Sequence, residues 1–176
     1  MPARKSDSEG RDTVDQTDGR ALTAWERVTA QLAAVLESME DGLFLILTHP
    51  RTGSFVQFAG QRDGILRAEA VSNVYLAPEA RLSAEAEEQL ALLGWHAPTH
   101  DDATEQAEGA HPEFGSTNYY LDLHPPVRHL DAAVLAIRTL AGVYGVRRPG
   151  ELRHTAFREN GPQIWYRGFA IKPEEG

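Results

Sequence analysis

The spacing of apolar residues changes abruptly at Asp41-Gly42, and this change limits the folds open to the chain. Before it, large apolar residues recur every three or four positions, as on one face of a helix: Trp25, Val28, Leu32, Val35, Leu36 and Met39. After it, short apolar runs alternate with turn residues as far as position 71. A helix followed directly by closely spaced strands predicts an α+β domain, in which the helix packs on one face of a sheet.

Local chemistry sets the boundaries of these first elements. Thr23 and Glu26 have the spacing of a capping box, and Asp41-Gly42 is expected to end the helix because glycine accepts the left-handed conformation. The strands that follow are predicted at residues 43–48, 54–59 and 65–71.

The third of these strands shows the clearest alternation. Leu66, Ala68 and Ala70 fall on one face, whereas Arg67 and Glu69 fall on the other. This pattern is typical of a half-buried strand in an antiparallel meander. The first strand is the most apolar and is expected to be central.

The remaining elements are predicted from caps and spacing. A second helix begins at Ser83 and ends at Gly94, a strand covers 118–123 and a last strand covers 151–158. The third helix follows Pro125-Pro126, with a predicted inward face of Val127, Leu130, Val134, Ile137, Ala141 and Tyr144. The predicted fold is an antiparallel β-meander packed by three helices, in the order α-β-β-β-α-β-α. Residues 163–171 are apolar enough to dock, but no pattern places them.

Length and charge divide the chain into segments. Its 176 residues suit one domain, which we expect at residues 21–158. Residues 1–20 are polar and are expected to be a disordered tail. Residues 97–117 carry five acids and no Lys or Arg, which predicts a mobile acidic loop within the domain, and residues 159–176 form a C-terminal extension.

Composition argues against several classes of protein. The chain has no cysteine, which excludes disulfides, thiolate metal sites and cysteine nucleophiles. Its net charge of −9 argues against a nucleic-acid partner. No apolar run is long enough to span a bilayer, and the N-terminus lacks the apolar centre of a signal peptide. We therefore expect a cytoplasmic protein with neither a nucleic-acid nor a membrane partner. The 15 Arg against 2 Lys, with abundant Ala, indicate a bacterial source.

Histidines offer the main route to an enzymatic interpretation. His96, His100 and His111 flank the acidic pair Asp101-Asp102, but the predicted loop offers little to hold metal ligands at fixed geometry. The sequence also lacks a nucleophile elbow and a phosphate-binding glycine loop. We expect no metal, no cofactor and no catalytic residue. A small hydrolase or metal-dependent enzyme that uses the loop histidines is the alternative.

The stretch after the third strand has two interpretations. Ser72, Asn73 and Tyr75 can form a polar and aromatic surface that binds a partner, and we take them as candidate partner-binding residues. In the favoured structural interpretation, Asn73 satisfies backbone groups at a turn while Tyr75 and Leu76 fill the core.

Several short motifs resemble a known family. They are Phe55-Val-Gln-Phe-Ala59, Leu66-Arg-Ala-Glu-Ala-Val-Ser-Asn-Val-Tyr-Leu76, Leu93-Gly-Trp95 followed by Pro98, Val143-Tyr-Gly-Val146 and Pro149-Gly-Glu-Leu152. Over about residues 22–158 the chain resembles the actinobacterial TY-Chap family, which groups type III secretion chaperone-like and YbjN-like domains. One departure is that a single predicted strand separates the second and third helices, where secretion chaperones usually show two.

This resemblance implies a fold and a role. It implies the secretion-chaperone-like fold and a non-enzymatic chaperone-like or adaptor protein that binds a partner polypeptide, in a secretion or effector context. The expected partner is another protein, with a homodimer left open.

Overall fold

The first helix begins where the capping residues predict. In the computed structural model, which describes residues 23–100 and 116–174, α1 (Ala24–Glu37) has Thr23 as its N-cap. The Thr23 hydroxyl accepts the Glu26 N–H at 3.2 Å, and the Glu26 carboxylate accepts the Thr23 N–H at 2.7 Å. The helix ends at Glu37, before Asp41-Gly42, and Gly42 has a φ of +73° in the turn into the sheet.

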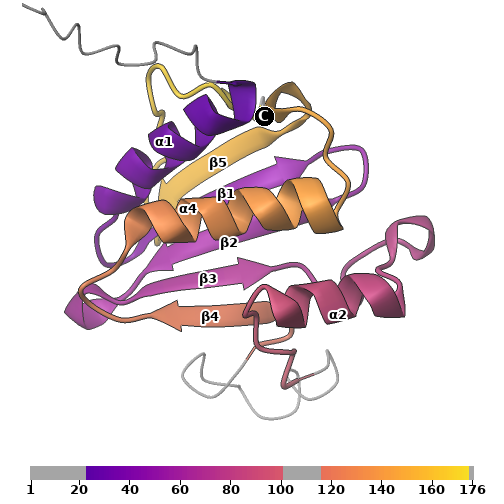
Figure 1. Cartoon of the computed structure of the whole chain (residues 1–176). Coiled ribbons are helices and arrows are strands. Elements are labelled where there is room, and N and C mark those ends of the chain that lie inside the picture. Colours follow the sequence, from indigo (N-terminus) through magenta and orange to yellow (C-terminus); the bar gives the residue numbers. More distant parts are fainter. Residues whose placement is uncertain (1–22, 101–115, 175–176) are drawn as a thin grey trace, which may run out of the picture.

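The described residues contain a six-stranded sheet in the order β4-β3-β2-β1-β5-β6 (Figure 1). Its strands are β1 (Leu43–His49), β2 (Ser54–Gly60), β3 (Leu66–Ala70), β4 (Tyr119–Leu123), β5 (Arg153–Arg158) and β6 (Lys172–Pro173). Neighbours are antiparallel except for β5 and β6, which are parallel. The predicted α+β fold with an antiparallel meander is confirmed, and β1 lies inside the sheet between β2 and β5.

The α-helices of the described residues lie together on one side of the sheet (Figure 1). They are α1, α2 (Ala84–Leu92) and α4 (His129–Arg138), and a π-helical turn, η4 (Thr139–Val143), continues α4. Short 3-10 turns occur at η1 (Arg62–Gly64), η2 (Pro78–Ala80) and η5 (Pro149–Glu151). None of the helices in the two described stretches has the length and apolarity to cross a membrane.

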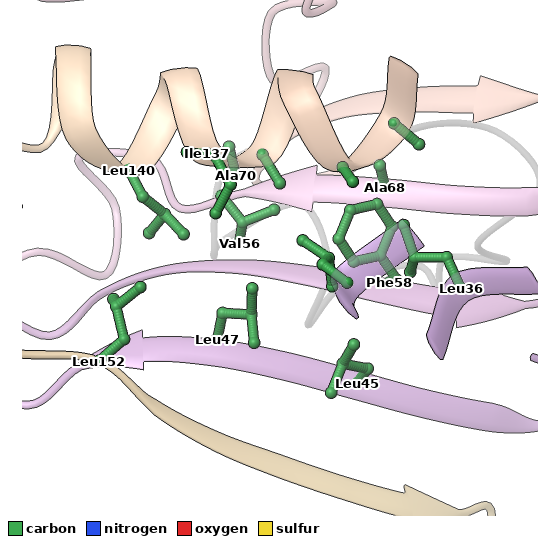
Figure 2. Close-up of a cluster of buried hydrophobic side chains, with 14 of the residues drawn as sticks. Leu36, Leu45, Leu47, Val56, Phe58, Ala68, Ala70, Ile137, Leu140 and Leu152 are labelled. Carbon is green, nitrogen blue, oxygen red and sulfur yellow. The ribbon is translucent and has the colours of Figure 1, made fainter. Parts of the chain in front are cut away.

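The core fills the space between this helical layer and the sheet. Side chains from the strands point toward the helices, among them Leu45, Leu47, Val56 and Phe58 (Figure 2). Each of these is at most 1% exposed. Burial of this kind stabilises the fold by about 25 cal/mol per Å² of apolar surface removed from water.

The inward face predicted for the third helix was right for Ile137, which is buried, and wrong for Leu130 and Val134. Leu130 and Val134 are 58% and 39% exposed, whereas the buried residues of α4 are Ala132, Ala133, Ala136 and Ile137. The helix packs against both α1 and the sheet, and small side chains allow that close approach. Leu130 and Val134 therefore point outward.

The C-terminal residues that the sequence could not place form part of the sheet layer. Gln163 pairs with Phe157 through an isolated bridge, and Lys172–Pro173 form β6 beside β5. Ile171 is fully buried. The predicted tail at residues 1–20 and most of the predicted acidic loop, at 101–115, lie outside the described residues.

Candidate functional site

One side of the sheet carries no helix from the described residues (Figure 1). The strand register places the side chains on this side, here called the open face, in rows across the sheet. One row consists of Phe157, Phe44, Ala59, Arg67 and Asp122. The next row consists of Thr155, Ile46, Gln57, Glu69 and Tyr120. The open face therefore runs from an apolar half on β1 and β5 to a charged half on β3 and β4.

The apolar half is built around an aromatic pair. Phe44 and Phe157 face each other across the β1–β5 ladder, with ring centroids 5.1 Å apart and an interplanar angle of 11°. Ile46 is the next outward residue of β1, and Phe55 lies on β2. All four side chains are only partly buried. Large apolar side chains thus line a side of the sheet that no second layer of the described residues covers.

The charged half centres on Arg67. Its guanidinium donates from Nη1 to both carboxylate oxygens of Asp122 at 3.2 Å, and from Nε to Glu69 Oε1 at 3.2 Å. It also lies 4.9 Å from the centroid of the Tyr120 ring. The Arg67 side chain is only 8% exposed, against 14% for Glu69 and 34% for Asp122. The sequence predicted the outward position of Arg67 but not its burial.

Neutral donors complete the hydrogen bonding of Glu69. Its carboxylate accepts from the amide of Gln57, from the hydroxyl of Ser116 at 2.8 Å and from the amide of Asn118 at 3.5 Å. Ser116 and Asn118 precede β4, so the carboxylate connects β2, β3 and the entry to β4. Such a network holds the charged half in one arrangement, since each buried polar group has its partners.

A hollow of about 670 Å³ opens between the two halves. Ala59 and Gln57 lie between Phe44 on one side and the charged residues Arg67 and Asp122 on the other. The short side chain of Ala59 leaves space in the row between a phenyl ring and a guanidinium. The rest of the lining comes from the turns at the end of the sheet: Asp41, Gly42, Gly60, Gln61, Arg62, Asp63, Ile65, His124 and Glu159, with Glu69 also contributing.

The rim of this hollow is acidic. Asp41, Asp63 and Glu159 lie on the turns around it, with Arg62 as the one arginine among those turn residues. Arg67 already pairs with Glu69 and Asp122. The rim therefore favours a positively charged group.

The candidate residues after β3 make bonds within the chain. Ser72 is 3% exposed, and its hydroxyl donates to the Thr117 carbonyl at 2.7 Å. The Asn73 side chain accepts the Leu82 N–H at 2.6 Å and donates to the Leu82 carbonyl at 3.1 Å. These contacts agree with the structural interpretation of Asn73 as a residue that satisfies backbone groups.

Tyr75 differs from its two neighbours. It is 49% exposed, although its hydroxyl lies 2.8 Å from that of Thr117, and the adjacent Val74 is 38% exposed. The structural interpretation expected both Tyr75 and Leu76 to fill the core. Leu76 does, at 4% exposed, whereas Tyr75 does not. Partner binding by Ser72, Asn73 and Tyr75 stays a prediction, and Tyr75 has the most surface available for it.

The histidines of the enzymatic alternative lie in different settings. His96 pairs with Tyr120 on the outer edge of β4, and the His100 N–H donates to the Ser116 carbonyl at 3.3 Å. His111 and Asp101-Asp102 lie outside the described residues. Within 23–100 and 116–174, no three side chains of His, Cys, Asp or Glu gather closely enough to hold a metal ion.

Sequence reasoning did not identify the open face as a site, although β1 contained a signal. Its residues Leu43 to Leu47 are apolar without interruption, so both faces of the strand are apolar. In a strand with one buried and one solvated face, apolar residues would alternate with polar ones. The extra residues, Phe44 and Ile46, are those of the open face.

Comparison with protein-family models identifies the family of the chain. The family model described as TY-Chap3, "T3SS (YopN, CesT) and YbjN peptide-binding chaperone 3", matches residues 18–158, well over half of the chain. No curated protein and no solved structure matches the chain.

Proposed function

This chain belongs to the TY-Chap3 family of peptide-binding chaperones, and we propose that it is a non-enzymatic, chaperone-like adaptor that holds a segment of a partner polypeptide on the open face of its sheet. The observation that carries the proposal is the apolar half of that face. Phe44, Ile46, Phe55 and Phe157 remain partly exposed where no described element covers them.

Apolar side chains of this size favour a partner over water. Aromatic residues contribute large contact areas, and contiguous apolar patches on soluble proteins usually mark interaction sites. The antiparallel strands fix the spacing of the four side chains, so little further ordering is needed when a segment binds.

The charge around the hollow defines the partner more closely. Asp41, Asp63 and Glu159 on its rim favour a lysine or arginine, and the bound segment places that cation near Ala59 while its apolar residues contact the Phe44–Phe157 pair. Attraction between exposed charges weakens as salt screens them. The proposed ligand is an apolar segment that carries at least one basic residue.

The proposal also covers the cellular location of the protein and the kind of partner that it binds. The family description includes chaperones of type III secretion, so we propose a cytoplasmic protein that holds a secretion or effector partner. The partner is a protein and not a nucleic acid or a membrane. Open-face contact with a second copy of the chain is the homodimer alternative that the experiment below distinguishes.

Site-specific photo-crosslinking tests the surface. A photoreactive amino acid at Ile46 reports on the open face, and the same group at Leu92, which is 81% exposed on α2, is the matched control. A labelled peptide with aromatic and basic residues should crosslink at Ile46, and a peptide with acids in place of its basic residues should crosslink less. Added salt should reduce the difference between the two peptides.

Other outcomes would contradict the proposal. Crosslinking only at Leu92 would move the site to the helical side of the sheet. Crosslinking of Ile46 to a second copy of the chain, with a dimer in solution, would make the open face a self-association surface. Turnover of a generic ester or phosphate that is lost on His96→Ala or His100→Ala would instead support the hydrolase alternative.

A further inference from the structure

The residues after β5 return along the same strand and close its outer edge (Figure 1). The Ile164 N–H donates to the Ala156 carbonyl at 2.7 Å, and the Glu174 N–H donates to the His154 carbonyl at 2.9 Å. We call residues 163–174 the C-terminal strap. The family match ends at residue 158, so the strap lies outside the matched domain while occupying its edge.

Two side chains of the domain bind the main chain of the strap. The Gln31 amide on α1 donates to the Gly168 carbonyl at 2.9 Å and accepts the Ala170 N–H at 2.9 Å. His154 Nδ1 on β5 donates to the Ile171 carbonyl at 2.8 Å. A side-chain amide that pairs with both a carbonyl and an N–H recognises polypeptide backbone independently of its side chains.

Side chains of the strap supply apolar contacts of graded depth. Ile171 is fully buried in the core, whereas Ile164, Tyr166 and Phe169 pack against it only in part. Trp165 is 56% exposed. The contacts thus combine one deep aliphatic anchor, Ile171, with shallow contacts from Ile164, Tyr166 and Phe169.

The strap does not fill the groove in which it lies. A hollow of about 480 Å³ remains between α1, with Gln31, Ala34, Val35 and the C-cap Ser38 in its lining, and residues 165–169 of the strap. β6 itself is only two residues long, and its Pro173 has no N–H to donate. A longer or better matched segment would find both unused space and further backbone groups on β5.

We propose that the groove between α1 and β5 is a second peptide-binding site, which this chain occupies with its own C-terminal strap. Its ligand is an extended segment with an aliphatic residue at the position of Ile171 and an aromatic residue two positions earlier, as Phe169 is. The proposal concerns a surface separate from the open face. Because the strap is tethered, it competes at an effective concentration in the millimolar range, so a partner has to displace it.

The test uses the full-length chain with a protease site inserted at Asn160-Gly161, in an exposed turn before the strap. The chain folds with the strap in place and is then cut. A labelled peptide of residues 163–174 should exchange into the cut chain and bind the uncut chain far more weakly. A scrambled peptide should not bind.

Two substitutions identify the contacts. Gln31→Ala in the cut chain should weaken peptide binding about tenfold, since two backbone hydrogen bonds are lost. Ile171→Ala in the peptide should weaken it at least about thirtyfold, because the buried anchor is truncated. Phe55→Ala, on the open face of β2 and away from β5, should leave this binding unchanged, so failure here and failure of the proposed function are separable.

Hydrogen exchange of backbone amides in the uncut chain tests the proposal even if the cut chain fails to fold. If the strap opens on its own, the amides of Ala170 and Glu174 will exchange faster than those in the centre of β1. Exchange of all these amides together would show that the strap opens only on global unfolding and would overturn the proposal. So would a folded cut chain that takes up no labelled peptide.

Discussion

Replacing Arg67 with methionine removes the cation from the charged half of the open face while keeping an unbranched apolar side chain in its place. Arg67 is 8% exposed and pairs with Glu69 and Asp122, each at 3.2 Å. Breaking a buried ion pair by removing one partner usually costs about 3–5 kcal/mol, since the remaining charge stays buried without compensation. The two carboxylates differ in solvent exposure, and this difference sets the expected loss in the free energy of unfolding.

Asp122 is 34% exposed, so water can hydrate it once Arg67 is gone. Glu69 is 14% exposed and stays largely buried, although Gln57, Ser116 and Asn118 still donate to it. Only one carboxylate loses its counter-ion without access to water, and it keeps neutral donors. We therefore expect Arg67→Met to lower the free energy of unfolding by about 3 kcal/mol, the lower end of that range.

Urea unfolding followed by tryptophan fluorescence, to which the buried Trp95 contributes, measures this loss, provided that the slope with denaturant is unchanged. The matched control is Arg128→Met, because Arg128 pairs with Asp131 at 2.9 Å but is 83% exposed. It should cost less than about 1 kcal/mol. The double variant Arg67→Met with Glu69→Gln should recover most of the stability. If Arg67→Met costs no more than the control, or the double variant is as unstable as the single one, the reasoning is refuted.

Three further predictions concern the helix–sheet core, a close backbone contact and alkaline pH. Leu32→Ala should lower the free energy of unfolding by about 2–5 kcal/mol, whereas Leu92→Ala, at an 81% exposed position, should leave it nearly unchanged in the same urea assay. Gly60→Ala would place a Cβ 2.0 Å from the Glu40 carbonyl oxygen, so we expect a loss of about 1–3 kcal/mol; a neutral result would show that the loop yields freely. Burial raises the pKa of Tyr144, so above about pH 10, where the unfolded chain ionises, stability should fall by up to about 1.4 kcal/mol per pH unit. Tyr144→Phe should reduce this alkaline slope, and an unchanged slope would assign it to other groups.

The parts of the fold that follow from local sequence were predictable. The capping box at Thr23 and Glu26 fixed the start of α1, and the alternation in residues 66–70 fixed which side chains of β3 face the helices. These signals depend on neighbours in the chain, so sequence alone contains them. The contacts of Asn73 at its turn were predictable for the same reason.

Other features depend on which elements, distant in the sequence, pack against one another. The spacing in α4 fits either a leucine-containing face or an alanine face, and only the position of α1 beside it favours the alanines. Arg67 lies at an outward position of β3, where its burial depends on Asp122 from a distant strand. The strap is held through Gln31 and main-chain atoms, for which no periodic pattern exists. The open face was missed because alternation shows which way a side chain points, not whether another layer covers it.

Each outer edge of the sheet is partly covered by another segment of the chain, and this cover affects how the protein behaves at high concentration. His96 pairs with Tyr120 on the edge of β4, and at the other edge the strap ends with Pro173 in β6. Unpaired edges of an apolar sheet recruit strands from other molecules and lead to fibrillar aggregation. Proteolytic loss of the strap would expose β5, and we expect such a trimmed chain to polymerise at concentrations at which the intact chain stays dispersed.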